Sequence, residues 1–277
     1  MLSRTTAANA ELTFDVALNA FGVSVEVRCT GRGAEDLARE VTRIWSRCLR
    51  ADGKQAELQI EACVDPDPEV LAKARQRRAV AYDNPASVLH VLTPTVTVGA
   101  IDARRGHLVM LHAAGIALDS GDVIAFVAPS GTGKTTIATF LGRHFSYVTD
   151  ETLAMTLDGA VVPYPKPLSV VTEDADGLKD QTRPDDLALR EPPPELRLAR
   201  IVLVDRTPDG PDVAEWTDVE LLDGLAELTA QVSYLKEIPG MLHTLADLAD
   251  STGGIRRVRY REVASLLPAM ESMRDGV

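Results

Sequence analysis

The N-terminal part of the chain carries a period-two pattern of apolar and polar residues, interrupted by one segment with a helical period. Residues 11–18 and 23–29 alternate in this way, which predicts a hairpin of two strands joined by a short turn. Residues 35–49 repeat apolar side chains at helical spacing, and residues 58–64 return to a strand pattern that ends before two prolines. We therefore expect residues 1–85 to form a small N-terminal α+β domain that serves as a scaffold or docks a partner.

The rest of the chain, residues 86–277, alternates continuous apolar runs with helical segments, which predicts an α/β domain. The pattern predicts buried strands over 108–118, 123–127, 145–149 and 201–204, an exposed strand over 255–260, a hairpin turn at 157–160, and helices over 134–143, 220–238, 241–250 and 262–273. Residues 172–196 are rich in Asp, Glu and Pro and predict an exposed loop. The basic segment 69–105 predicts a solvated helix face or a surface for an acidic partner.

Composition and charge narrow the class of protein. With 277 residues, 45% hydrophobic and 25% charged, the chain is globular rather than disordered or fibrous. Its 29 basic and 41 acidic residues give a net charge of −12, which argues against binding to nucleic acid or to an anionic membrane. We see no apolar segment near the length of a membrane span and no signal peptide, so we expect a cytoplasmic protein. Three cysteines without metal-ligand spacing predict reduced, buried thiols rather than a zinc site or disulfides.

The clearest chemical signal is the run Ala128-Pro-Ser-Gly-Thr-Gly-Lys-Thr-Thr136, between a predicted buried strand and a predicted helix. It matches the phosphate-loop (P-loop, Walker A) pattern G-x-x-x-x-G-K-[ST], except that Ala128 replaces the first glycine. Glycines allow backbone N–H groups to turn inward around phosphate oxygens, and the following helix directs its unpaired N–H groups at the same anion. We therefore predict a nucleoside-triphosphate site that comprises Ala128, Pro129, Ser130, Gly131, Thr132, Gly133, Lys134, Thr135 and Thr136.

A phosphate-loop protein also needs an acidic side chain for metal or proton chemistry. Asp150 and Glu151 follow the strand predicted over 145–149, and Asp205 follows the strand predicted over 201–204. Asp205 can equally be a strand-end residue that caps a turn, so at this stage either position can serve the metal.

Three segments together resemble the catalytic core of the HPr kinase/phosphorylase family. They are Leu111-His-Ala-Ala-Gly, the phosphate loop, and Val-Thr-Asp-Glu151. The match is closer to the HPr-kinase-related proteins associated with peptide-modification genes, in which a segment like Pro163-Tyr-Pro-Lys-Pro-Leu-Ser169 follows the acidic strand. The resemblance covers residues 105–170 well and the C-terminal helices loosely. It implies a P-loop kinase core with a mixed sheet resembling that of phosphoenolpyruvate carboxykinase.

The resemblance also implies roles for single residues. Lys134 and Thr135 would hold ATP and Mg²⁺, and Asp150 would be the base that accepts the proton of an acceptor hydroxyl. Glu151 would lie near the metal, at a position where the family usually has Asp, and His112 would orient or tune the acidic pair.

Lys166 lies in a segment flanked by prolines and is either a contact for phosphate or acceptor or an ordinary surface lysine.

These residues together predict an ATP- and Mg²⁺-dependent kinase that phosphorylates a hydroxyl, most simply Ser or Thr of a peptide or small protein. A kinase for a small alcohol or free amino acid and a nucleotide-dependent regulatory ATPase are the alternatives, and homo-oligomerisation is left open. A GTPase is not expected, because the chain has no N/T-K-x-D segment to read guanine. The E-I-R-G-L-G signature that accompanies phosphorylase activity in the family is also absent from the sequence.

Overall fold

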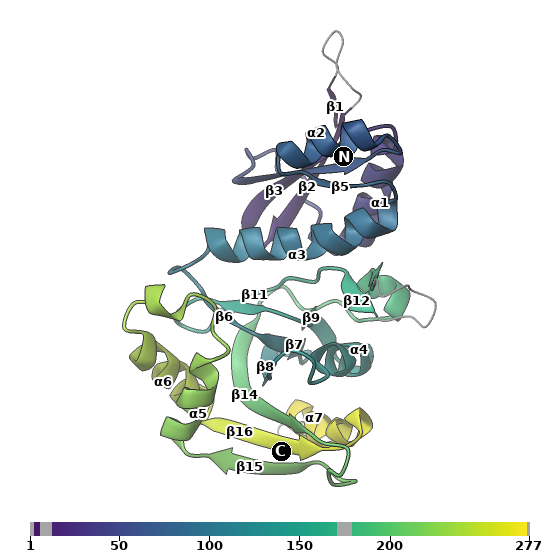
Figure 1. Ribbon diagram of the computed structural model, residues 1–277. Coiled ribbons are helices and arrows are strands. Elements are labelled where there is room, and N and C mark those ends of the chain that lie inside the picture. The colour runs from purple at the N-terminus through teal and green to yellow at the C-terminus, as the bar shows by residue number, and fades with distance from the viewer. Residues whose placement is uncertain (1–2, 6–12, 171–178, 276–277) are drawn as a thin grey trace. The chain divides into compact units, whose positions relative to one another are not determined.

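The computed structural model describes residues 3–5, 13–170 and 179–275, in a mixed α/β architecture with several sheets (Figure 1). Two compact units share the chain. Unit 1 contains Met1–Ala103 with Lys166–Pro184, and unit 2 contains Arg104–Pro165 with Asp185–Val277. The boundary that we expected between residues 85 and 86 falls at the start of helix α3 (Pro85–Ala103), which belongs to unit 1 as a whole.

Unit 1 is built on a five-stranded mixed sheet. Its strands lie in chain order: β1 (Ser3–Thr5), β2 (Thr13–Ala20), β3 (Val23–Thr30), β4 (Leu58–Val64) and β5 (Val80–Tyr82). The first three strands are antiparallel, and the last three are parallel. The predicted hairpin is confirmed as β2 and β3, whose turn places Phe21 and Gly22 at positive φ. A second, two-stranded sheet joins β12 (Leu168–Val170) to β13 (Asp180–Thr182).

Among its described residues, unit 1 also contains three α-helices and a short 3₁₀ helix. They are α1 (Ala34–Ile44), followed by the short 3₁₀ helix η1 (Ser46–Cys48), then α2 (Pro68–Gln76) and α3. The predicted helix over 35–49 is confirmed in its α1 part, where Leu37, Val41 and Ile44 are fully buried. The three cysteines are free and buried, as we expected. Burial raises the pKa of Cys29 and of Cys48 to about 12, so both thiols are protonated and unreactive at neutral pH.

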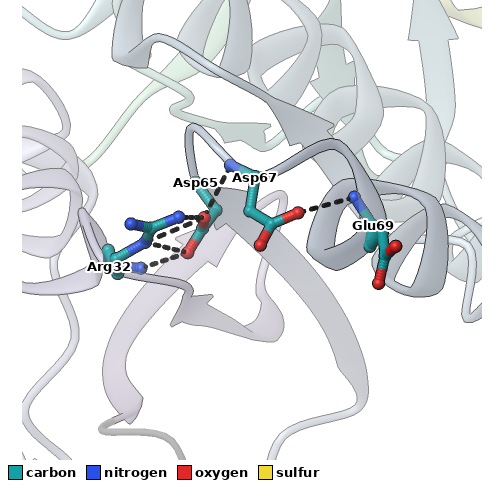
Figure 2. Close-up of polar contacts among 4 residues, drawn as sticks. All are labelled: Arg32, Asp65, Asp67 and Glu69. Carbon is teal, nitrogen blue, oxygen red and sulfur yellow. Dashed lines mark hydrogen bonds and ion pairs between the residues drawn. The ribbon is translucent and has the colours of Figure 1, made fainter.

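A buried carboxylate joins the ends of β3 and β4 (Figure 2). Asp65 accepts hydrogen bonds from the backbone N–H of Arg32 at 2.9 Å, from its Nε at 3.1 Å and from its Nη2 at 3.0 Å. Asp65 also accepts from the backbone N–H of Asp67, whose own carboxylate caps α2 by accepting from the N–H of Glu69. The Asp-Pro-Asp-Pro run therefore ends β4, begins α2 and secures the loop after β3.

Helix α3 corrects one expectation. It has a mean hydropathy of 1.3 over an 18-residue window, so by length and composition it can cross a membrane, although we expected no such segment. The threonines and Pro94 interrupt the apolar run in the sequence, so the segment does not read as a continuous apolar helix. In the helix, the hydroxyls of Thr93 and Thr97 donate to backbone carbonyls one turn earlier, which satisfies these polar groups within the helix. One such helix is weak evidence, because core helices of soluble proteins pass the same test. Val88, Leu92 and Val96 are fully buried, which is consistent with a soluble protein, and a cytoplasmic location stays a prediction.

Unit 2 is built on a six-stranded mixed sheet in the order β15-β16-β14-β8-β7-β9. The strands are β7 (Ala113–Ala117), β8 (Asp122–Val127), β9 (Ser146–Thr149), β14 (Arg197–Arg206), β15 (Glu215–Val219) and β16 (Ile255–Tyr260). A three-stranded sheet joins β11 (Val161–Val162), β10 (Leu153–Met155) and β6 (Val109–Leu111), and it contains the predicted hairpin turn. The strands predicted over 123–127 and 145–149 are confirmed as β8 and β9.

Helices cover both faces of the six-stranded sheet (Figure 1). They are α4 (Lys134–His144), α5 (Leu221–Thr229), α6 (Met241–Ser251) and α7 (Leu267–Arg274), with short 3₁₀ helices at Leu235–Glu237 and Val263–Leu266. Val123, Ala125 and Val127 of β8 share one core with leucines of α5 and α6. The alternate residues Ile124 and Phe126 are also buried, because side chains alternate across a strand and the opposite face is covered too.

Several predicted elements of unit 2 are wrong in extent. The run 108–118 is two strands, β6 and β7, which belong to different sheets and meet at His112. The helix predicted over 220–238 ends at Thr229, and the strand β15 was not expected. Strand β16 has the expected limits but is an inner strand with buried residues rather than an exposed one.

The predicted loop 172–196 is described only from residue 179. This part contains β13 and a short 3₁₀ helix at Pro184–Leu187. Residues 172–178 lie outside the described part.

Candidate active site

One edge of the six-stranded sheet collects the predicted site residues of unit 2. Strand β8 runs parallel to β14, and β7 is antiparallel to both β8 and β9, so β9 also runs parallel to β8. The carboxyl ends of β8, β9 and β14 and the start of β7 therefore lie at the same edge. Ligands of open α/β sheets bind at the carboxyl ends of parallel strands. The phosphate loop follows β8 at this edge, the acidic pair follows β9, and His112 precedes β7.

The phosphate loop has the backbone of an anion nest. Gly131 and Gly133 lie in the left-handed region, at φ of +81° and +96°, which only glycine adopts without strain. Helix α4 begins directly after them, and no side chain caps its first N–H groups. The Thr132 hydroxyl donates to Pro129 O at 2.7 Å and closes the loop. Ala128 does not have a positive φ, which explains why an alanine can replace the first glycine of the pattern.

Ser130 of the loop and Thr136 in the first turn of α4 are both exposed.

Lys134 is a buried cation without a carboxylate partner. Its side chain is 6% exposed, and Nζ donates to the carbonyl oxygens of Ala128 and Pro129, each at 2.7 Å. Burial lowers the pKa of Lys134 to about 8, although the nearby charges of Glu151 and Asp150 raise it. No ion pair with a carboxylate forms among the described residues, so a bound anion is the natural partner for this charge.

Asp150 is held between two hydroxyl groups. Its Oδ2 accepts from the Thr135 hydroxyl at 3.1 Å, and its Oδ1 accepts from the Tyr147 hydroxyl at 3.2 Å. Asp150 is 4% exposed and Tyr147 is fully buried. The contact joins Asp150, which follows β9, to the first turn of α4. Sequence reasoning missed Tyr147, whose signal was a hydroxyl within a buried strand, three residues before the acid.

Glu151 and His112 lie beside this pair and are half-buried. Both residues form backbone hydrogen bonds. The carbonyl oxygen of Glu151 accepts from the backbone N–H of Ala113, and the backbone N–H of His112 donates to Gln231 O at 2.7 Å. Burial lowers the pKa of His112, and the charge of Lys134 lowers it further, although Glu151 and Asp150 oppose this. The imidazole is therefore neutral at physiological pH.

Asp205 does not join the cluster around Thr135. It is two residues after Leu203 on β14, which packs in the core with α5 and α6, so strand alternation turns Asp205 toward that face. Its carboxylate forms an ion pair with Arg259 at 3.9 Å. Asp150 is therefore the acid in contact with the phosphate-loop threonine.

Lys166 belongs to unit 1 and is 1% exposed, so its interpretation as a surface lysine is wrong. Its amine donates to Pro167 O at 3.3 Å. A contact between Lys166 and a phosphate or an acceptor stays a prediction.

The chain matches no protein-family model and no curated protein. Among the described residues, no group of three or more His, Cys, Asp or Glu side chains could hold a metal ion by itself. Mg²⁺ bound together with a nucleotide needs only one or two protein ligands, because phosphate oxygens and water supply the others. The nest, the unpaired Lys134 charge and the pair of Thr135 and Asp150 therefore fit Mg²⁺ and a nucleoside triphosphate.

Proposed function

We propose that this protein is an ATP- and Mg²⁺-dependent kinase of the HPr-kinase-related type, which transfers the γ-phosphoryl group to a Ser or Thr hydroxyl of a peptide or small protein. One observation carries the proposal. At the carboxyl edge of the sheet, the phosphate-loop residue Thr135 donates a hydrogen bond to Asp150, the acid that follows β9, two strands from β8 in the sheet. This is the pairing that a phosphoryl-transfer site requires between the nucleotide loop and an acidic side chain.

On this proposal, the phosphate loop positions the triphosphate. The N–H groups of Gly131 to Thr135 and the first turn of α4 donate to phosphate oxygens. The Lys134 amine breaks its hydrogen bonds to the carbonyl oxygens of Ala128 and Pro129 and forms bonds to oxygens of the terminal phosphates. The free-energy cost of this change is small, because the amine is already removed from water. Thr135 and Glu151 are the residues that would hold Mg²⁺, which when bound neutralises charge on the phosphates.

Asp150 accepts the proton in the transfer step. The acceptor hydroxyl oxygen forms a bond to the γ-phosphorus while the bond from that phosphorus to the β,γ-bridging oxygen breaks. The hydroxyl proton passes to Asp150, and ADP leaves with the bridging oxygen. The hydroxyls of Thr135 and Tyr147 hold the carboxylate in place for the acceptor hydroxyl. Neutral His112 orients the acidic pair without adding charge.

The acceptor class rests on the resemblance to kinases associated with peptide-modification genes. The N-terminal residues 1–85 carry no chemical motif of their own, so acceptor docking is the role that we propose for them, together with the acidic and proline-rich loop 172–196.

The proposal is tested by incubating the protein with Mg²⁺, ATP and candidate peptides encoded near its gene, followed by mass spectrometry. We expect a mass increase of one phosphoryl group on a Ser or Thr of one peptide. Lys134→Ala should abolish the transfer, whereas Lys236→Ala, which removes an exposed lysine of unit 2, should not. ATP turnover that is the same with and without every acceptor would instead identify a regulatory ATPase. Phosphorylation of free amino acids or alcohols alone would identify a small-molecule kinase.

A further inference from the structure

An arginine lies in front of the phosphate loop at the end of the neighbouring strand. Register pairs Leu203 of β14 with Val127 of β8, and β14 continues to Arg206, past the point where β8 turns into the loop. A Cβ atom built on Gly133 would lie 3.6 Å from Nη1 of Arg206 and 3.7 Å from its Cδ. The guanidinium therefore lies against the glycine that precedes Lys134.

The alternation of β14 explains this direction. Leu203 packs in the core with α5 and α6, so alternation places Asp205 on the same face of β14 and Arg206 on the opposite face, toward the phosphate loop. In register with it on β16 lies Tyr260, which is buried and supports the arginine from the side away from β8. The charge of Arg206 opposes the burial that raises the pKa of Tyr260 to about 12, so the two groups are close.

Arg206 lacks the acidic partner that its neighbours have. Arg257 pairs with Glu227, Arg259 with Asp205 and Arg261 with Asp212. Among the described residues, Arg206 forms no ion pair, and its hydrogen bond runs from Nε to Arg261 O at 3.3 Å. This bond fixes the plane of the guanidinium group. The two Nη groups carry four further N–H donors that can bind an anion. Within the described part of the chain, Arg206 is therefore an exposed cation without a carboxylate partner beside the glycine turn of the phosphate loop.

A single phosphate can contact both groups. The distance from N to Cβ within a residue is about 2.5 Å, so Nη1 lies within about 6 Å of the Gly133 amide nitrogen. Hydrogen bonds of about 2.9 Å from each donor can therefore meet on one phosphate group without movement of the backbone. Guanidinium is the side-chain group that best matches the geometry of phosphate oxygens.

We infer that Arg206 binds the terminal phosphates of the nucleoside triphosphate. It ends β14 on one side of β8, whereas Asp150 follows β9 on the other side. The inference rests on the proposed nucleotide site and adds a residue to it. Arg206 completes a pair of cations with Lys134. The buried amine approaches the phosphates from within the loop, and the exposed guanidinium approaches them from the end of β14. Charge that moves onto the terminal phosphates during transfer is stabilised by such a residue.

The experiment measures nucleotide affinity by isothermal titration calorimetry, with Mg²⁺ and a non-hydrolysable ATP analogue, ADP or AMP. The full chain is compared with Arg206→Ala, Arg206→Lys and a matched control, Arg197→Ala. Arg197 lies at the other end of β14, is exposed and carries the same charge, but it lies at the opposite edge of the sheet and pairs with Asp158. Circular dichroism and thermal unfolding establish that each variant is folded.

We expect Arg206→Ala to weaken binding of the ATP analogue by about 10- to 100-fold and to leave AMP binding unchanged. Arg206→Lys should retain part of the affinity, and Arg197→Ala should match wild type. Unchanged affinity in Arg206→Ala, an equal loss for AMP, or an equal loss in Arg197→Ala would overturn the inference while leaving the nucleotide site intact. A wild-type chain that binds no nucleotide would overturn the inference and the proposed function together. If nucleotide binding depends on Arg206 but the protein transfers no phosphoryl group, the inference stands and only the proposed kinase activity is overturned.

Discussion

Replacing Asp150 with Asn removes the carboxylate charge while retaining the shape of the side chain. In the structure, Asp150 accepts one hydrogen bond from Thr135 and one from Tyr147, both hydroxyls. An Asn can accept from one hydroxyl and donate to the other, because a hydroxyl group rotates and also accepts. We therefore expect Asp150→Asn to cost about 1 kcal/mol of the free energy of unfolding and to remain folded.

The expected effect on activity is much larger. Absence of a proton acceptor typically costs on the order of 10²–10⁴ in rate, which corresponds to about 3–5 kcal/mol in the activation free energy. The assay measures ATP turnover under single-turnover conditions and, separately, ATP affinity by calorimetry. We expect turnover to collapse while the affinity for ATP is retained.

Asp205→Asn is the matched control, because it makes the same change at the end of β14, where the carboxylate pairs with Arg259. We expect near-normal turnover in this variant. The contact of Asp150 with Thr135 also makes a metal role testable: if Asp150 is chiefly a metal ligand, excess Mg²⁺ will restore turnover in Asp150→Asn, and we expect no such rescue. An inactive Asp205→Asn beside a near-normal Asp150→Asn would refute the reasoning. The likeness of the Val-Thr-Asp-Glu segment to the kinase family would then have to be abandoned.

Three further predictions concern the phosphate loop and the stability of unit 1. Burial lowers the pKa of Lys134 to about 8, so the nucleotide-free protein loses this proton as pH rises through that value. Calorimetry between pH 7 and 9 should therefore show that the affinity for ATP falls with rising pH. An affinity that does not change with pH would contradict the role of Lys134 in binding phosphate. Gly133→Ala should lower the free energy of unfolding by about 1–2 kcal/mol and weaken ATP binding. Gly253→Ala is the control, because Gly253 also has a positive φ but no atom of the described residues within contact distance of an added Cβ; it should lower the free energy of unfolding equally and leave the affinity for ATP unchanged. Burial would raise the pKa of Asp65, but its bonds from Arg32 and Asp67 lower it below 3.8, so Asp65→Asn should cost about 1.5–3 kcal/mol in urea unfolding at pH 7. That difference should vanish as pH falls through the lowered pKa, and a difference that grows in acid would be inconsistent with this role.

The sequence predicted those parts of the fold whose signals are local. Strands β4 and β8 and helix α4 have limits within a residue or so of those expected, because each is bounded by a glycine, a proline or a turn. The sequence also selected Thr135 and Asp150 as site residues, and the structure places them in hydrogen-bond contact.

The remaining features depend on non-local packing. The apolar run through His112 gives no sign that its two halves join different sheets, which depends on their pairing with β10 and β8. Strand β15 is an exposed edge strand, so its residues lack the apolar alternation that signals burial. Arg206 could not be selected from sequence, because its place beside Gly133 depends on the packing of β14 against β8.

The central claim is that the phosphate loop and Asp150 together transfer a phosphoryl group to a hydroxyl. It is tested most directly with ATP radiolabelled at the γ-phosphate, added with Mg²⁺ to the wild-type chain and a peptide acceptor. The account predicts that the label moves to a Ser or Thr of the peptide, and that Lys134→Ala and Asp150→Asn each prevent it. Label that appears only as free inorganic phosphate, at a rate independent of the acceptor and of Asp150, would contradict it.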